Sequence, residues 1–334
     1  MAERLVVGAD GGNSKTDLVL ADTSGRVWAR VRGAGTRPMQ DGMAETAARL
    51  HALVGTARSQ AAAAGLSSDA PIEVGAFYLA NLDTEPAEAV MHKELAALGV
   101  AARLVVRNDT FAVLGAGRAG RGGVGVVGGA GINAVGVHPD GRVARFLALG
   151  PHTGDWGGGR SLGMAALGAA VRAGDGRGPA SMLREAVAAH FGRASPEEVA
   201  LAVEERHLTW REIITLTPVL YAVAEAGDAA ALSIVDRMAD EVATMATALL
   251  NRLDLGHATV PVVLGGGALQ NAPERLIRRV RENVAASAPR SRVVVLDVPP
   301  VAGPLVDALA LAAASAEAVE RARADLAGRP SPAS

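Results

Sequence analysis

Hydrophobic and polar positions near the N-terminus alternate in short runs that have the length of β-strands. Residues 5–8 and 16–21 are apolar runs, joined by the polar, glycine-rich segment 10–15. A turn signal at 22–25 precedes a third apolar run at 27–31. This order predicts an antiparallel meander of three strands whose first connection is a glycine-rich loop.

Strands alternate with helices after this meander. We expect a helix over 44–64, a strand over 72–79, a helix over 86–98 and a strand over 104–106. Because helices and strands alternate along this stretch, the pattern predicts an α/β sheet.

The opening pattern returns near residue 124. An apolar strand there leads into the glycine loop 128–131, a strand over 134–137, a turn and a third strand from 143. Two ordered copies of the same pattern predict a duplicated fold with two domains.

The second copy carries a long helical insertion. Apolar residues recur with the period of a helix from 161 to 253, and helix caps are predicted at Ser195 and Asp228. A strand at 260–264, a helix from about 273, a strand at 293–296 and a helix over 303–324 follow.

These elements predict two domains and a tail. We expect an N-terminal domain over 1–118, a C-terminal domain over 119–325 and a frayed tail over 326–334. The last helix is expected either within the second domain or packed back on the first.

Composition narrows the functional class. The 334 residues are 49% hydrophobic and 20% charged, as in globular proteins long enough for two domains. The net charge of −2, without a separate basic cluster, argues against a nucleic-acid partner. Because the chain has no cysteine, disulfides, thiol nucleophiles, thiolate zinc sites and cysteine-bound iron–sulfur clusters are excluded.

No secretory or membrane-spanning segment is expected. The N-terminal apolar run is too short and follows Arg4 too closely for a signal peptide. No stretch approaches about 20 apolar residues, the length needed to cross a bilayer. We therefore expect a cytoplasmic protein.

The first glycine-rich loop is not a P-loop, because Ser14 stands where that motif needs glycine and a strand follows instead of a helix. A glycine-rich hairpin can still bind phosphate through backbone N–H groups, with Asp10 facing a magnesium ion through water. The same loop also fits an ordinary polar turn. The predicted phosphate-binding residues are Gly11, Gly12, Asn13, Ser14 and Lys15, with Gly128, Gly129, Ala130 and Gly131 in the second loop.

Asp109 is the candidate catalytic residue. It follows the strand at 104–106 and precedes a short helix, so it can act as a helix N-cap or, beside two phosphate loops, as a general base.

Two further glycine-rich loops carry candidate site residues. In segment 154–159, Asp155 can accept hydrogen bonds from sugar hydroxyls, although the segment also fits a flexible linker. Gly265, Gly266 and Gly267 follow a strand and precede a helix, which suits either a nucleoside lying on the backbone or a tight turn.

Together these motifs resemble the family of N-acetylglucosamine kinases and BadF/BadG-type ATPases, within the sugar kinase, heat-shock and actin superfamily. The resemblance covers residues 5–314 and rests on the order and spacing of the motifs. It implies two actin-like (ribonuclease H-like) ATPase domains of α/β class with a cleft between them, ATP with Mg²⁺, and a small-molecule sugar. It is also compatible with a homodimer.

The resemblance also implies roles for individual residues. Asp109 and Asp155 would contact the sugar hydroxyls, Gly129, Ala130 and Asn133 would lie near the sugar, and Ser14 would contact the phosphates. Thr36 and Arg37 occupy the loop where related kinases often carry asparagine, which leaves the identity of the sugar open. Asn81 is expected to take the place of that asparagine.

We therefore predict an ATP-dependent kinase that phosphorylates the 6-hydroxyl of N-acetylglucosamine or a close hexosamine or hexose. The alternative is an ATPase that couples hydrolysis to a conformational change in a partner protein. Iron–sulfur activators that share the ATPase core need cysteines, which this chain lacks.

Overall fold

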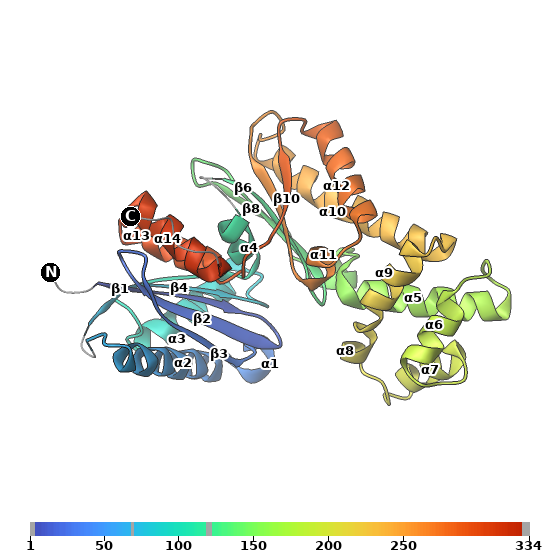
Figure 1. Cartoon of the computed structure of the whole chain (residues 1–334), viewed down its shortest axis with the longest axis horizontal. Helices are drawn as coiled ribbons and strands as arrows, with labels where there is room; N and C mark the ends of the chain where they lie inside the picture. Colours follow the sequence, from blue (N-terminus) through green and yellow to red (C-terminus); the bar gives the residue numbers. More distant parts are fainter. Residues whose placement is uncertain (1–3, 68–69, 118–121, 329–334) are drawn as a thin grey trace. The chain divides into compact units, whose positions relative to one another are not determined.

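The computed structural model describes residues 4–67, 70–117 and 122–328 (Figure 1). Contacts divide the chain into two compact units. Unit 1 comprises Met1–Gly120 and Leu296–Ser334, and unit 2 comprises Arg121–Val295.

This division differs from the expected domains at the C-terminal end. The expected boundary between residues 118 and 119, like most of the expected tail, lies outside the described residues. Residues 296–325 belong to unit 1, in line with the expected alternative in which the last helix packs back on the first domain. The physical reason is that the helix starting at 302 packs on the first strand of the chain.

Unit 1 contains a five-stranded sheet in the order β3-β2-β1-β4-β5. The strands are β1 (Leu5–Gly11), β2 (Lys15–Asp22), β3 (Val27–Ala34), β4 (Ile72–Leu79) and β5 (Arg103–Asn108). The first three form the expected antiparallel meander, whereas β4 and β5 continue the sheet parallel to β1.

Helices cover both faces of this sheet (Figure 1). The helices of unit 1 are α1 (Pro38–Asp41), α2 (Met43–Ala63), α3 (Glu85–Ala97), α4 (Thr110–Gly117), α13 (Ala302–Leu311) and α14 (Ala316–Ala327). Side chains along β1 alternate between the two faces of the sheet. On one face, Val7 belongs to the hydrophobic core cluster that also contains Leu50 of α2. Gly8 lies directly against α13, because a Cβ on Gly8 would be only 2.5 Å from the backbone nitrogen of Leu305.

Unit 2 repeats the strand order of unit 1. Its strands are β6 (Gly123–Gly128), β7 (Ile132–Val137), β8 (Val143–Arg145), β9 (Pro261–Gly265) and β10 (Arg292–Val295), in the order β10-β9-β6-β7-β8. Again the first three strands are antiparallel and the last two run parallel to the first. The predicted α/β fold with a duplicated meander is therefore confirmed.

The expected helical insertion lies between β8 and β9. It contains a 3₁₀ turn (Gly150–Thr153), α5 (Gly158–Asp175), α6 (Leu183–His190), α7 (Pro196–Glu204), α8 (Trp210–Ile213), α9 (Leu216–Glu225) and α10 (Ala229–Arg252). Ser195 and Asp228 cap α7 and α10, as predicted, by accepting from backbone N–H groups three residues on. After β9 come α11 (Gly267–Gln270) and α12 (Glu274–Ser287).

The single helix expected over 303–324 is in fact two helices, α13 and α14. Ala313 between them adopts a left-handed conformation with φ 56°. The hydroxyl of Ser315 then accepts from the N–H of Ala318 at 3.2 Å and starts a new helix. The alanine-rich sequence holds no glycine or proline at the break, so helical periodicity alone did not reveal it.

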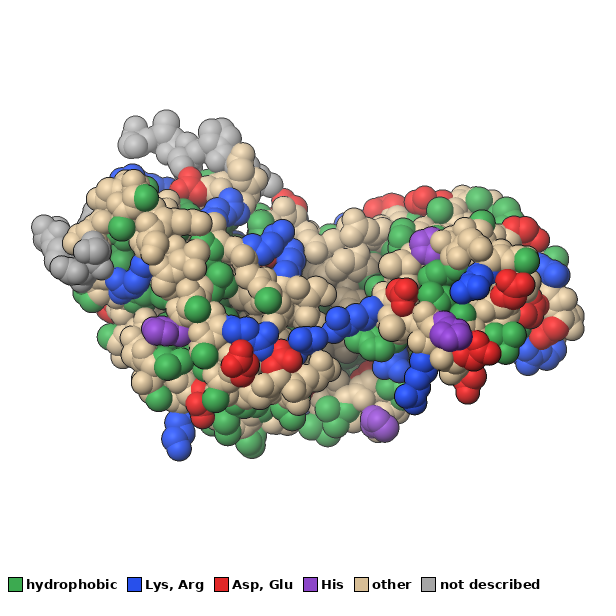
Figure 2. Space-filling view, turned by 90° about the horizontal axis from the view of Figure 1, so that it is seen from below, with side chains coloured by type: hydrophobic (Ala, Val, Ile, Leu, Met, Phe, Trp, Pro, Cys, Tyr) green, Lys and Arg blue, Asp and Glu red, His purple; other side chains and the backbone are tan. Residues whose placement is uncertain are grey.

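Acidic and basic side chains are interspersed on the face that Figure 2 presents, with scattered apolar side chains among them. Within the described ranges, no single helix is long and apolar enough to span a membrane. The segments Trp210–Glu225 and Ala229–Arg252 meet that length and composition only together, as a pair bent by 115°.

Candidate functional site

The carboxyl ends of three parallel strands meet at one edge of the unit 1 sheet. In register, Gly11 of β1 lies beside Leu79 of β4, and Leu79 lies beside Asn108 of β5. Asp10 lies one position before this row, and Asp109 one position after it. The sheet therefore brings together the two carboxylates that were predicted to bind magnesium and to act as the base.

The loop between β1 and β2 is held by its neighbours. The N–H of Gly12 donates to the carbonyl of Lys15 at 2.9 Å, and the N–H of Thr36 donates to the carbonyl of Gly12 at 2.9 Å. The side-chain amide of Asn81 donates to Oδ1 of Asn13 at 2.8 Å. Thr36 and Asn81, which were expected at the sugar, thus support the loop that was expected to bind phosphate.

Ser14 and Lys15 at the tip of this loop are exposed, and both can donate hydrogen bonds to an anion. Lys15 also lies 3.4 Å from the carboxylate of Asp17. The tip of the loop therefore offers donors in the way that phosphate binding requires.

Arg37 is tied to its own segment. It contacts the carboxylate of Asp41, which also accepts from Arg49 at 2.5 Å. The hydrogen bond from Arg49, more than the charge of Arg37, holds the pKa of Asp41 below its usual value. The structure accordingly gives Arg37 a partner inside unit 1, and its role at a sugar stays a prediction.

Asn108, rather than Asp109, provides the side-chain oxygen at the start of α4. Oδ1 of Asn108 accepts from the backbone N–H of Thr110 at 3.0 Å and from its hydroxyl at 2.7 Å. The amide nitrogen of Asn108 donates to Asp83 at 2.9 Å. The start of the helix therefore has a side-chain partner that does not involve the carboxylate of Asp109.

Both carboxylates lie where a negative charge is poorly solvated. Burial and then the negative charge of Asp109 raise the pKa of Asp10 to about 8. Burial and then the charge of Asp83 raise the pKa of Asp109 to about 7. A carboxylate with a pKa near 7 can take up a proton at neutral pH, which is what a general base must do.

The raised pKa of Asp10 predicts a stability effect. A folded-state pKa above the unfolded value of 3.8 favours folding at low pH, and this contribution is lost as pH rises towards about 8. We expect Asp10→Asn to stabilise the protein by at least about 1 kcal/mol at pH 8 and by much less at pH 5. Thermal unfolding without nucleotide or divalent ions would measure this.

Glu73→Gln is the matched control for this prediction, because Glu73 on β4 forms surface ion pairs with Arg4 and Arg103 and does not act on the pKa of Asp10. It removes one negative charge from the same sheet and should not stabilise the protein. Equal melting temperatures for wild type and Asp10→Asn at pH 8 would contradict the prediction.

The donor set around Asp10 fits a hydrated divalent ion. Within the described residues no three His, Asp or Glu side chains converge as a metal cage would require. Mg²⁺ is usually held by one or two carboxylates together with water and phosphate oxygens. Asp10, repelled by Asp109 and Asp17, suits such an ion because a divalent cation would relieve the repulsion.

Glycine-rich segments of unit 2 meet at the loop between β6 and β7. Within this loop the N–H of Gly129 donates to the carbonyl of Gly131 at 2.9 Å. From the start of α5, Gly159 N–H donates to the carbonyl of Gly129 at 2.8 Å, and Arg160 N–H to that of Ala130 at 2.9 Å. The two loops therefore form one hydrogen-bonded assembly.

Close backbone contact explains two of the glycines. Gly158 has a φ of 70°, and a Cβ there would lie 2.1 Å from the carbonyl oxygen of Gly131. Gly266 has a φ of 84°, and its Cβ would lie 2.6 Å from the carbonyl oxygen of Gly128. The predicted segment Gly265 to Gly267 thus packs on the second predicted phosphate loop.

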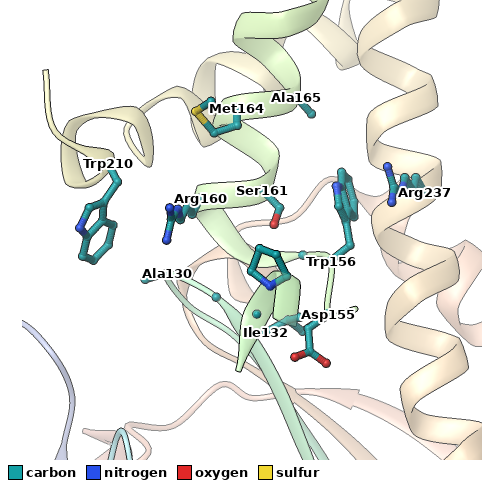
Figure 3. A pocket seen from close by; sticks show the side chains of 14 residues that line it. Ala130, Ile132, Asp155, Trp156, Arg160, Ser161, Met164, Ala165, Trp210 and Arg237 are labelled. Carbon is teal, nitrogen blue, oxygen red and sulfur yellow. The ribbon is translucent and has the colours of Figure 1, made fainter. Parts of the chain in front are cut away.

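A cavity of about 660 Å³, here called the Trp156 cavity, lies on one side of this assembly (Figure 3). Asp155 is its acidic residue, and its carboxylate accepts from the hydroxyl of Thr153. Trp156 has the guanidinium of Arg237 over its ring at 4.0 Å. The cavity is lined by Ala130, Gly131, Ile132, Gly150, Pro151, Asp155, Trp156, Gly157, Arg160, Ser161, Met164, Ala165, Trp210 and Arg237.

A second cavity of about 640 Å³, the Tyr221 cavity, shares the same glycine loops. Its lining includes Gly129, Gly159 and Gly267, and the Tyr221 hydroxyl is held by the carbonyl of Ala268 at 2.6 Å. Thr217 is 7% exposed and also lines it. Its hydroxyl oxygen has no hydrogen-bond partner among the residues that the structure describes.

The structure groups most of the predicted site residues. Those of unit 1 gather at the edge of its sheet, and those of unit 2 gather at the glycine assembly. Asn133 differs, because its side-chain oxygen accepts from the N–H of Ala134 at 2.7 Å and it does not line either cavity.

Sequence reasoning missed Arg160, Trp210 and Arg237 in the Trp156 cavity, and Thr217 and Tyr221 in the other. All five lie on helices of the insertion, namely α5, α8, α9 and α10. The helical period showed which faces are buried but not which helices enclose a cavity.

The chain is similar in sequence and structure to proteins named as N-acetylglucosamine kinases. N-acetylmuramic acid/N-acetylglucosamine kinase of Clostridium acetobutylicum is 25% identical over 268 residues, which cover 80% of this chain and 86% of that protein. N-acetyl-D-glucosamine kinase of Dictyostelium discoideum is 22% identical over 294 residues, covering 85% and 92%. The solved structure of a candidate N-acetylglucosamine kinase from Chromobacterium violaceum superposes with a TM-score of 0.67 at 25% identity, covering 91% and 98%.

The likeness to this solved kinase agrees with the fold inferred from the duplicated sheets. The model of the BadF/BadG/BcrA/BcrD ATPase family matches residues 7–303, which include both sheets and the helical insertion. This chain belongs to the BadF/BadG/BcrA/BcrD ATPase family.

Proposed function

We propose that the protein is an ATP-dependent kinase that phosphorylates N-acetylglucosamine or a close relative at the 6-hydroxyl. The observation that carries the proposal is the pair of cavities in unit 2 that share the glycine loops 128–131 and 157–160. A phosphotransferase needs a donor site and an acceptor site separated by groups that contact the phosphates. The names of both curated relatives include N-acetylglucosamine, and one also includes N-acetylmuramic acid.

The Tyr221 cavity suits the nucleoside. It combines an apolar interior with a few polar groups, as small-molecule sites do. The side chain of Asn271 at its border can bind a base or ribose, and the Thr217 side chain is buried in its wall. Gly129, Gly131 and Gly267 have open space where a side chain would stand, so phosphate oxygens can approach the backbone there.

The Trp156 cavity suits the sugar. Asp155 can accept from two hydroxyls, and the indoles of Trp156 and Trp210 offer apolar surface for a pyranose ring. In the proposed reaction the sugar oxygen bonds to the γ-phosphorus while the bond to the bridging oxygen of ADP breaks. Asp109 takes the hydroxyl proton.

Magnesium fits this scheme at Asp10. When bound, the ion would neutralise charge on the triphosphate. Lys15, Ser14 and the N–H groups of the first loop would donate hydrogen bonds to phosphate oxygens. The raised pKa of Asp109 matches its proposed task at neutral pH.

A coupled assay of ADP release across hexoses, hexosamines and N-acetylated hexosamines tests the proposal. We expect N-acetylglucosamine to raise ADP release at least about 10-fold over the sugar-free rate, with the phosphate found on carbon 6 by NMR. ATP hydrolysis that is independent of every sugar would overturn the kinase assignment and favour an ATPase that acts on a partner protein.

A further inference from the structure

The loop between β4 and α3 lies against the first glycine-rich loop. Just beyond the last paired residues of β4 and β1, the N–H of Ala80 donates to the carbonyl of Gly11 at 2.7 Å. The side-chain amide of the next residue, Asn81, donates to Oδ1 of Asn13 at 2.8 Å. Two neighbouring hydrogen bonds therefore tie this loop to the segment that is proposed to bind phosphate.

Asn81 has an unusual backbone conformation for a residue with a side chain. Its φ is 64°, in the left-handed region that glycine adopts without strain. Asparagine tolerates this region better than most residues do, but glycine would suit the backbone at least as well. What asparagine adds at this position is its amide group, which makes the hydrogen bond to Asn13.

The backbone around Asn13 is already held by other contacts. The N–H of Gly12 donates to the carbonyl of Lys15 at 2.9 Å. A Cβ on Gly35 would lie only 2.3 Å from the carbonyl oxygen of Asn13, so the two segments are in close contact there. The hydrogen bond from Asn81 therefore fixes the orientation of the Asn13 side-chain amide more than the course of the loop.

The orientation of this amide decides what Asn13 offers to an anion. Because the oxygen of the amide accepts from Asn81, its nitrogen, on the other side of the same carbon, faces away from Asn81. The two N–H donors of this nitrogen have no hydrogen-bond partner within residues 4–67, 70–117 and 122–328. The side chains that follow, Ser14 and Lys15, are exposed and also donate. Three successive side chains thus present donors, whereas the opposite orientation of Asn13 would present an oxygen that repels phosphate.

We propose that Asn81 is a positioning residue that turns the side-chain amide of Asn13 so that its N–H groups donate to phosphate oxygens of the bound nucleotide. A contact residue that is held in its productive orientation before the ligand arrives loses less conformational freedom on binding. This inference rests on the proposed function in placing nucleotide phosphates at the first loop. It assigns Asn81 to the phosphates through Asn13, and not to the sugar.

Calorimetry with Mg²⁺ and AMP-PNP, an ATP analogue that is not hydrolysed, tests the proposal in the absence of sugar. Asn13→Ala should weaken binding by about 10-fold, because hydrogen bonding to a charged group is lost. Asn81→Gly should weaken binding by about 3- to 10-fold, since the Asn13 amide is then free to rotate. Because Asn81 acts through Asn13, the double variant should bind within about 2-fold of Asn13→Ala alone.

Asn81→Asp reverses the direction of the hydrogen bond. A carboxylate only accepts, so the nitrogen of Asn13 turns towards it and the oxygen of Asn13 faces the phosphates. We expect this variant to bind AMP-PNP at least about 3-fold more weakly than Asn81→Gly does. The effect of the added charge itself is measured by the same substitution in the Asn13→Ala background, where the loss should be smaller.

Thr84→Ala is the matched structural control on the same loop. The hydroxyl of Thr84 accepts from the N–H of Ala87 at 3.4 Å and caps α3, so this variant should lower the melting temperature without changing nucleotide affinity. Asn81→Gly should show the reverse, with a melting temperature close to that of wild type, because glycine suits a φ of 64°.

The proposal is overturned if Asn81→Gly binds AMP-PNP as tightly as wild type, or if the losses of the two single variants add in the double variant. An Asn81→Gly protein that loses affinity for the sugar alone would also overturn it. Failure of the proposed function is separate: it would appear as AMP-PNP binding that depends on Asn13 and Asn81 with no sugar-dependent ADP release.

Discussion

Asp109→Asn is expected to lower kcat for sugar phosphorylation by about 100-fold or more while leaving the melting temperature and ATP affinity close to wild type. Asparagine caps a helix about as well as aspartate but cannot accept the hydroxyl proton. Asn108 already provides the side-chain oxygen at the start of α4, so little of the helix depends on Asp109. Loss of a base of this kind corresponds to about 2.7 kcal/mol of transition-state stabilisation.

Steady-state kinetics with both substrates saturating, together with thermal unfolding, would measure this effect. Asn108→Ala is the structural control, because it removes the hydrogen bonds to Thr110 and Asp83 and should lower stability by about 1 to 3 kcal/mol. If the Asp109→Asn enzyme kept more than about a tenth of kcat with chemistry rate-limiting, Asp109 would not be the base.

Gly158→Ala is expected to have the second largest effect, about a 100-fold loss in kcat/KM together with about 2 to 4 kcal/mol of stability. A side chain at φ 70° is strained, and its Cβ would lie 2.1 Å from the carbonyl oxygen of Gly131. Because that oxygen belongs to a loop shared by both cavities, relieving the clash shifts the loop. A displacement of about 1 Å at a reacting centre can cost 100-fold in rate.

Gly168→Ala provides the matched control on the same helix. A Cβ at Gly168 meets nothing within 4 Å, so the substitution should stabilise α5 by about 0.5 to 1 kcal/mol through helix propensity. Its activity should equal that of wild type. Wild-type stability and kinetics for Gly158→Ala would show that the contact with Gly131 does not constrain the loops.

Much of the fold was predictable because its signals are local. The apolar runs and glycine loops around 10–15 and 128–131 gave both meanders, and the caps Ser195 and Asp228 marked helix starts correctly. The break between α13 and α14 was not predictable, since Ala313 adopts a positive φ that its sequence does not signal. Ala313 closes α13 in a left-handed conformation that glycine usually provides, so residue type does not mark the break.

The candidate site was predictable only in part for the same reason. Acids that follow strands, such as Asp10 and Asp109, are placed by sheet topology, and glycine loops signal close backbone contacts. Arg160 and Trp210 can be assigned to the site only because α5 and α8 border the same cavity in the folded chain. Periodicity within each helix contains no information about such a meeting.

The insertion between β8 and β9 suggests how the family could change its substrate without rebuilding its catalyst. The groups proposed for phosphoryl transfer lie on hairpins and strand ends that recur in both sheets. Most of the side chains that line the Trp156 cavity come from residues 150–237, which have no counterpart between β3 and β4 of unit 1 beyond α1 and α2. Evolution, or a designer building a kinase for a new sugar, can therefore vary the side chains of that segment that line the Trp156 cavity, while the duplicated scaffold and the residues of α9 that line the Tyr221 cavity stay unchanged.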